Sequence, residues 1–173
     1  MKLEREGNLR VARPKTFATR NDLPADVRKK VVNLLNQQLA DTFDLYSQSK
    51  QAHWNVKGMD FFQLHELFDK LCDSLEDYVD LIAERATALG GTALGTVRMS
   101  AAGSRLPEYP VDAVEGRDHV EALAARFAAL GKTSRAAIDS AASLQDADTA
   151  DLFTEVSRGL DKHLWFLEAH LTP

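Results

Sequence analysis

The sequence has little cysteine, little proline and no long apolar run. It contains one cysteine, Cys72, and five prolines among 173 residues. A single cysteine excludes a disulfide scaffold and a cysteine-based zinc or iron–sulfur site, and it is typical of a reducing compartment. No run of about 18 apolar residues exists, so the sequence predicts no membrane span. The first twenty residues mix charges without an apolar stretch, so we expect no secretory signal and a soluble, cytoplasmic protein.

The charge is unevenly distributed along the chain, although the formal net charge is only -5. Residues 1–30 carry nine Lys and Arg against four Asp and Glu, whereas residues 31–173 carry twelve against twenty-two. Residues 1–21 also show little apolar periodicity. We therefore expect a basic arm over residues 1–21, disordered or loosely docked, and one domain over residues 22–173.

Apolar residues recur at three- and four-residue steps in four long segments, and strand-type alternation is not sustained anywhere. We expect helices from Asp22-Leu23-Pro24 to about Trp54, from Asp60 to Gly90-Gly91, from Asp112 to about Leu144, and from Thr149 to His170. The connection over residues 91–111 is long, with room for a short helical turn near residues 97–101. Short, long and short connections predict an all-α, ferritin-like four-helix bundle with a long crossover between its second and third helices.

The second predicted helix has an apolar stripe and, opposite it, a polar stripe. The polar stripe consists of His65, Asp69, Asp80 and Glu84. His65 with Asp69, and Asp80 with Glu84, are i,i+4 pairs whose side chains can point at a common spot. The two pairs are separated by about 22 Å along the helix axis, at ~1.5 Å per residue. Within one chain they therefore cannot share a metal ion.

The spacing of these four residues is symmetric about a point between residues 74 and 75. If two copies of the helix pack antiparallel about a twofold axis there, His65 faces Glu84 of the second copy and Asp69 faces its Asp80. His53, at the end of the first helix, can fold toward His65 across a short connection. Imidazoles and carboxylates with open positions suit Fe(II) better than a closed zinc site. The alternative is that these side chains form an ordinary solvent-exposed polar face and bind no metal.

Several segments resemble the Dps family, the DNA-binding proteins from starved cells, which are ferritin-like mini-ferritins. The resemblance covers about residues 24–171. Its motifs are Lys50-Gln51-Ala52-His53-Trp54-Asn55-Val56-Lys57-Gly58, His65-Glu66, Asp69, Asp80, Ala83-Glu84-Arg85 and Leu89-Gly90-Gly91, with Asp148-Thr149-Ala150-Asp151 and Leu160-Asp161-Lys162 near the end. The Glu-x-x-His signature of intra-bundle di-iron proteins is absent from this chain.

The resemblance implies a hollow homo-dodecamer with a ferroxidase centre at each twofold interface. One subunit would supply His53, His65 and Asp69, and its mate Asp80 and Glu84. Such a centre would oxidise Fe(II) with hydrogen peroxide, and the ferric mineral would be stored in the cavity. Trp54 would be a candidate electron donor. The alternative is that Trp54 is only an aromatic side chain buried in a subunit interface.

Other residues carry weaker expectations. Asp148 and Asp151 match the family segment that lines an acidic iron-entry pore, and the alternative is helix capping by Asp148. For Cys72 a structural thiol is the favoured interpretation, while Asp73 and Glu76 could face either the cavity or the twofold axis. We expect no metal role for the remaining histidines, His119, His163 and His170.

The basic arm suggests non-specific DNA binding through phosphate contacts, multiplied by many copies on one shell. Its cationic residues are Lys2, Arg5, Arg10, Arg13, Lys15 and Arg20. DNA binding would place the protein at the nucleoid. The alternative for the arm is that it only aids solubility or subunit contacts. The alternative for the whole protein is a non-enzymatic DNA-compacting protein, in which the polar stripe of the second helix only makes a subunit interface polar.

Overall fold

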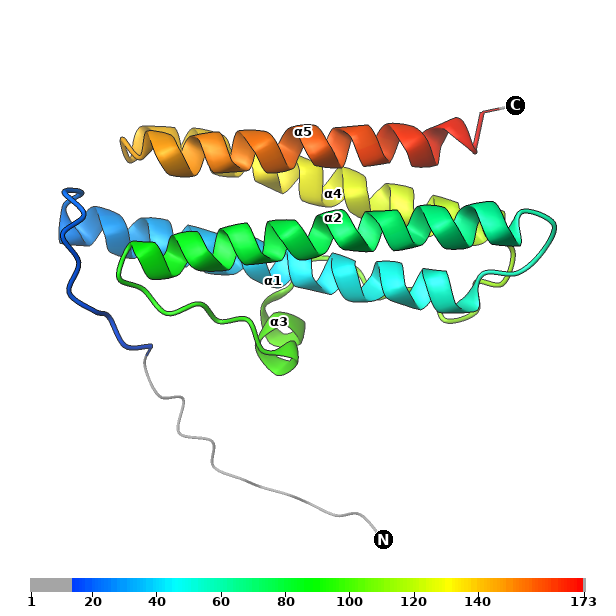
Figure 1. Cartoon of the computed structure of the whole chain (residues 1–173), viewed down its shortest axis with the longest axis horizontal. Helices are drawn as coiled ribbons and strands as arrows, with labels where there is room; N and C mark the ends of the chain where they lie inside the picture. Colours follow the sequence, from blue (N-terminus) through cyan, green and yellow to red (C-terminus); the bar gives the residue numbers. More distant parts are fainter. Residues whose placement is uncertain (1–13, 173) are drawn as a thin grey trace, which may run out of the picture.

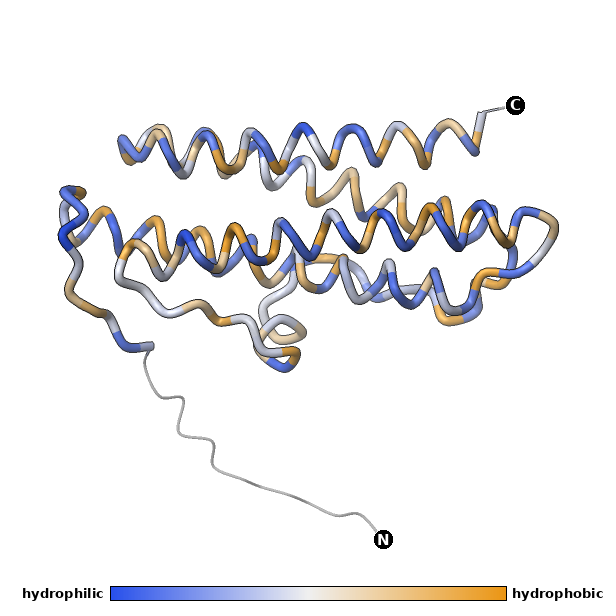
Figure 2. Tube along the Cα trace, viewed as in Figure 1, coloured by the Kyte–Doolittle hydropathy of each residue, from blue (hydrophilic) through white to orange (hydrophobic). Residues whose placement is uncertain are grey.

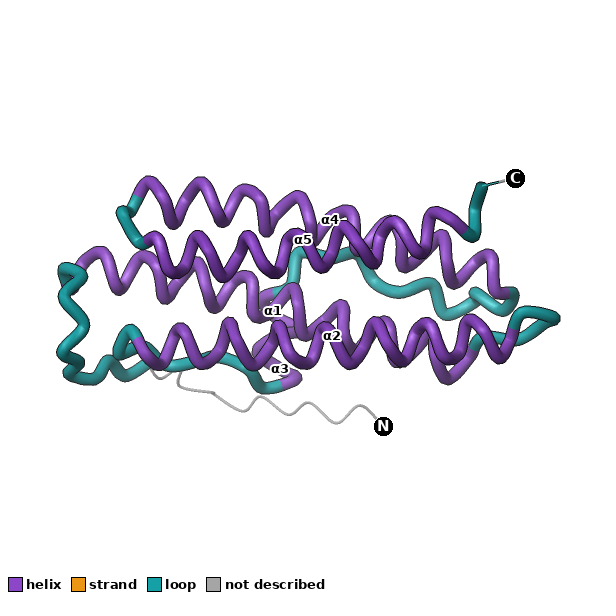
Figure 3. Tube along the Cα trace, turned by 45° about the horizontal axis from the view of Figure 1, so that its top comes forward, coloured by secondary structure: helices purple, strands orange, loops and turns teal. Residues whose placement is uncertain are grey.

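The computed structural model describes residues 14–172, and over that part of the chain it contains five helices and no strand. The helices are α1 (Ala25–Asn55), α2 (Phe61–Ala88), α3 (Val97–Gly103), α4 (Gly116–Ser143) and α5 (Ala147–Ala169). The four long helices lie side by side, and short α3 sits outside them on the crossover (Figures 1 and 3). The predicted all-α four-helix bundle with its long crossover is confirmed.

The core lies between the four long helices, because each of them alternates apolar and polar residues along its length (Figure 2). One cluster of buried side chains surrounds Phe68 and Phe127, and a second surrounds Leu35, Ile82 and Phe153. Each such side chain contributes about 1.5–3 kcal/mol when it is fully removed from water. None of the described helices combines the length and apolar character that crossing a membrane requires.

The helix starts differ from the sequence-based expectation. Asp22 does not cap α1, because Pro24 occupies the N-cap and no side chain accepts a hydrogen bond there. The expected start at Asp112 is also wrong, since a capping box formed by Glu115 and Asp118 opens α4. At α5 the cap is Asp146, whose carboxylate accepts a hydrogen bond from the Thr149 amide, so Asp148 lies inside the first turn.

The described part of the basic arm, residues 14–21, is docked on the turn that follows α2. The Phe17 amide donates to the Gly90 carbonyl oxygen at 2.8 Å, and Thr92 Oγ1 donates to the Lys15 carbonyl oxygen at 2.7 Å. Gly90 has φ 78°, and a Cβ there would lie 2.5 Å from the Phe17 carbonyl oxygen. Position 90 therefore requires a positive φ and the absence of a Cβ, and only glycine provides both. Lys15 and Arg20 thus sit, exposed, on a docked segment, while Lys2, Arg5, Arg10 and Arg13 lie outside the described residues.

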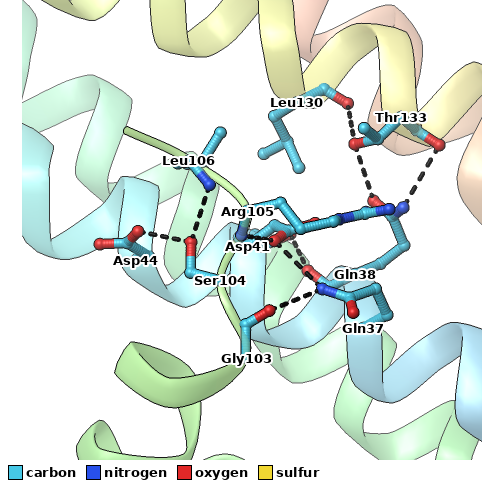
Figure 4. A network of polar contacts seen from close by, with 11 residues as sticks. Gln37, Gln38, Asp41, Asp44, Gly103, Ser104, Arg105, Leu106, Leu130 and Thr133 are labelled. Atoms are coloured by element: carbon cyan, nitrogen blue, oxygen red, sulfur yellow. Dashed lines mark hydrogen bonds and ion pairs between the residues drawn. The ribbon is translucent and has the colours of Figure 1, made fainter. Parts of the chain in front are cut away.

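A network of polar contacts holds the crossover against α1 (Figure 4). Asp41, which is 1% exposed, accepts hydrogen bonds from the Arg105 amide at 2.8 Å and from Arg105 Nε at 2.9 Å. Nearby, Ser104 Oγ donates to Asp44 Oδ2, and Gln37 Nε2 donates to the Gly103 carbonyl oxygen at 2.9 Å. A buried carboxylate is tolerated only when it is paired and hydrogen-bonded, so Arg105 fixes the path of the crossover.

Candidate metal centre

The short connection between α1 and α2 brings two histidines face to face. His53 lies in the last turn of α1, and His65 lies near the start of α2. Their imidazole rings are stacked, with centroids 3.7 Å apart and an interplanar angle of 22°. Gly58, with φ 105°, allows the chain to reverse within the few residues between the helices. The structure therefore brings His53 to His65, as expected from the short connection between the two helices.

Reciprocal hydrogen bonds fix the orientation of both rings. His53 Nδ1 is 2.9 Å from the His65 carbonyl oxygen, and His65 Nδ1 is 2.9 Å from the His53 carbonyl oxygen. A carbonyl oxygen only accepts, so each Nδ1 must carry the proton and donate it. In a neutral imidazole the lone pair then sits on Nε2. This is the arrangement in which metal-binding histidines are held by backbone carbonyls.

Asp69 lies one turn after His65, and its carboxylate is beside the histidine pair. Its Oδ1 is 3.9 Å from His53 Nδ1 and accepts a hydrogen bond of 2.6 Å from Lys50 Nζ. That hydrogen bond, more than any other influence, lowers the pKa of the Asp69 carboxyl below its usual value and raises the pKa of Lys50. Asp69 is therefore ionised at neutral pH.

Asp80 and Glu84 are exposed further along α2, away from this cluster. Within residues 14–172 no group of three or more His, Cys, Asp and Glu side chains could hold a metal ion. His53 at the end of α1 and His65 and Asp69 on α2 thus lie together, whereas Asp80 and Glu84 lie apart from them further along α2.

Large apolar side chains are exposed around the α1–α2 turn. Trp54 is 68% exposed, Met59 97% and Phe62 68%, and Leu81 is also exposed on α2. Exposed apolar side chains that gather beside polar ones are typical of a protein–protein interface. Trp54 follows His53 directly and is not buried by its own chain.

The predicted pore residues are exposed at the start of α5. Asp148 and Asp151 both lie in its first two turns, where a negative charge favours the helix. Arg85 Nη1 is 3.7 Å from Asp148 Oδ2, while Arg85 Nη2 donates to the buried Asp146 at 2.7 Å. The two exposed aspartates are therefore carried on a helix end that α2 holds in place.

The remaining candidates divide by burial. The Cys72 thiol is buried, and burial raises its pKa to about 12, which fits a structural thiol. Asp73 and Glu76 are exposed on α2. His119 and His163 are buried, and burial lowers the pKa of both. Aromatic side chains pack against both, Phe68 against His119 and Phe127 against His163.

Sequence reasoning missed Lys50 as part of this cluster. The residue stood in the family-like motif, three positions before His53. That spacing alone places Lys50 and His53 on one face of α1. The partner of Lys50, however, is on α2, nineteen residues away, and that contact depends on how the two helices pack.

Comparison with known proteins agrees with the fold. A family model described as the Ferritin-like domain matches residues 32–173. The DNA protection during starvation protein of Agrobacterium fabrum is 45% identical over 157 residues, which cover 91% of this chain and 97% of that protein.

Solved structures agree as well. The Dps of Mycobacterium smegmatis in a tetragonal crystal form matches with a TM-score of 0.87 at 30% identity, covering 92% of this chain and 96% of that one. Dps from Microbacterium arborescens in the high iron form matches with a TM-score of 0.81 at 32% identity, covering 90% and 99%. With a family model over most of its length and a relative of this similarity, the chain belongs to the Dps family of ferritin-like proteins.

Proposed function

We propose that this protein oxidises Fe(II) with hydrogen peroxide at centres completed by pairs of subunits, and stores the ferric product in the cavity of a homo-dodecamer. The supporting observation is the stacked His53–His65 pair, whose Nε2 atoms are free to bind a metal, beside the ionised Asp69. A relative solved in a high iron form adds support from the family.

A twofold contact between α2 helices would complete each centre. Antiparallel packing about residues 74 and 75 brings Asp80 and Glu84 of a second copy to His65 and Asp69 of the first. The exposed apolar side chains around the α1–α2 turn supply surface for such a contact. A twofold interface is self-complementary, so one contact produces two equivalent centres.

The donor set suits iron as a substrate. Imidazole nitrogens and carboxylate oxygens bind Fe(II), and the carboxylates offset the charge of the ion. Two Fe(II) ions, one hydrogen peroxide and two waters yield two ferric oxyhydroxide units and four protons, so both electrons reach the peroxide together and no hydroxyl radical is released. Trp54 is our candidate for donating one electron when a single Fe(II) is present, because it adjoins His53 and is exposed.

Iron would reach the cavity past Asp148 and Asp151. Both carboxylates are exposed on the first turns of α5. Where several copies of this helix end meet, their charges would concentrate Fe(II) near the opening by electrostatic attraction. Arg85, which donates hydrogen bonds to Asp146 and Thr149, would hold this helix end in position.

The test is peroxide-driven oxidation of Fe(II) by the purified protein, followed by size-exclusion chromatography. We expect rapid oxidation and co-elution of the ferric iron with a particle of about twelve subunits. The alternative function, a DNA-compacting protein without enzymatic activity, would produce oxidation no faster than in buffer and an iron-free particle. Those two results together would exclude the proposal.

We also propose non-specific DNA binding, which the name of the Agrobacterium relative favours and which would place this protein at the nucleoid in the cytoplasm. Deleting residues 1–13 removes Lys2, Arg5, Arg10 and Arg13 but leaves the docked segment and its contacts with Gly90 and Thr92 in place.

If phosphate contacts from these residues dominate, the truncated protein will lose gel retardation of DNA at low salt, and its affinity will depend less steeply on salt concentration. Replacement of Lys15 and Arg20 by Gln, in the full-length chain, measures the contribution of the docked segment. Undiminished retardation by the truncated protein would rule out the residues of the arm that it lacks.

A further inference from the structure

Lys50 places a fixed positive charge at the candidate metal centre. Its ammonium group donates a 2.6 Å hydrogen bond to Asp69 Oδ1, and its side chain is only 24% exposed. Among the described residues it forms an ion pair with no other carboxylate. The same Asp69 oxygen lies 3.9 Å from His53 Nδ1. The Lys50 ammonium group is therefore already bound to one oxygen of Asp69, a carboxylate that binds iron in the proposed function.

We propose that Lys50 is a positioning residue that keeps the oxidised iron from remaining at the centre. It orients Asp69 through Oδ1 and leaves Oδ2 for the metal, while its charge opposes the bound ion. The opposition is stronger for the ferric product than for the ferrous substrate, so the product leaves for the cavity. This inference rests on the proposed function and explains how ferric iron leaves the same centre.

The difference between the two oxidation states follows from Coulomb's law. The repulsion between Lys50 and a metal ion scales with the charge of the ion, so it is half as large again for Fe(III) as for Fe(II). If the charge weakens binding of a divalent ion about tenfold, it weakens binding of a trivalent ion about thirtyfold.

A storage protein needs such a bias because one centre must process many ions. Imidazoles and carboxylates that bind Fe(II) bind the more highly charged Fe(III) more tightly. A centre without an opposing charge would therefore fill with product after its first turnover. The position of Lys50, in contact with Asp69 rather than in open solvent, directs the repulsion at the ion held there.

A purely structural role is the competing explanation, because the Lys50–Asp69 pair also joins α1 to α2. Three variants separate the two roles. Lys50→Met removes the charge and retains the length of a partly buried side chain, and Lys50→Arg retains the charge. Lys132→Met is the control, since Lys132 is exposed on α4 and no ion pair involves it in the described chain. Thermal melting establishes first that each variant is folded.

The first measurement uses no iron and no activity. Isothermal titration with Zn(II), a divalent ion without redox chemistry, is expected to show about tenfold tighter binding by Lys50→Met than by the wild-type protein. Lys50→Arg and Lys132→Met should bind Zn(II) as the wild type does. Equal or weaker binding by Lys50→Met would overturn the inference and leave the pair as a structural contact.

The second measurement follows repeated additions of Fe(II) with peroxide in a stopped-flow instrument. For Lys50→Met we expect a lower KM for Fe(II), a normal first turnover and a later rate at least about threefold slower, because the product is retained. Lys50→Arg should sustain the wild-type rate. A sustained rate in Lys50→Met would refute product clearance by Lys50, whereas absence of oxidation in the wild type would refute the proposed function itself.

Discussion

Replacing His65 and Asp69 together with alanine is expected to slow peroxide-dependent oxidation of Fe(II) by about a hundredfold or more. The double variant removes one of the two stacked imidazoles and the ionised carboxylate beside them. Loss of even an outer partner of a metal ligand costs about 10–100-fold in metal affinity or activity, so loss of two ligands should exceed that range. His53 would also lose the ring against which it is stacked.

The measurement is the initial rate of Fe(III) formation, with the assembled state of each variant checked by light scattering. His170→Ala with Asp139→Ala is the matched control, because it removes the same two side-chain types from exposed positions on α4 and at the end of α5, outside the helices that carry the cluster. We expect the control to retain the wild-type rate. An unchanged rate in His65→Ala/Asp69→Ala would refute this centre.

The second large effect concerns stability rather than activity. Replacing Arg105 with methionine should lower the free energy of unfolding by about 3 kcal/mol, because Arg105, itself half exposed, is the cation that pairs with the buried Asp41 carboxylate, and without it that charge is left uncompensated. Asp41 is 1% exposed and would keep only the Arg105 amide and the amide of Gln37 as donors. The crossover between α2 and α4 would lose the side-chain hydrogen bonds that join Arg105 to α1.

Urea unfolding at a fixed protein concentration measures this loss, since assembly makes apparent stability depend on concentration. Arg117→Met is the control, because Arg117 pairs with Glu121 in an exposed i,i+4 arrangement. Exposed pairs of this kind contribute about 0.3–0.5 kcal/mol. If Arg105→Met unfolds within that range of the wild type, the Arg105–Asp41 pair does not stabilise the crossover.

The bundle itself was predictable because hydrophobic periodicity is a property of the local sequence. Apolar residues three and four positions apart define one face of a helix whatever the rest of the chain does. Helix starts were less predictable. Several acidic residues lie near the starts of α4 and α5, and Asp112, Asp146 and Asp148 are all of a type preferred at a helix start. The acidic residues that do cap these helices, Glu115 and Asp146, are selected by the path of the preceding chain.

In the candidate centre, too, some features were predictable from the sequence and others were not. The pairing of His53 with His65 could be predicted, because a short connection between antiparallel helices leaves few positions for their ends. The orientation of the rings could not, since it depends on hydrogen bonds to backbone carbonyls on the opposite helix. The positions of His65, Asp69, Asp80 and Glu84 on one face of α2 follow from helical geometry alone, whereas their meeting across a twofold axis in a pair of subunits is part of the proposed function.

By itself, the sequence determined the helical class, the order and approximate extent of the helices, and the face of α2 that carries His65, Asp69, Asp80 and Glu84. Tertiary structure alone decided that Lys50 reaches Asp69, that Arg105 neutralises Asp41, and that residues 14–21 dock on the Gly90 turn. The physical reason is range. Periodicity acts between neighbours on one helix, whereas each of these contacts joins residues nineteen or more positions apart and forms only once the helices have packed.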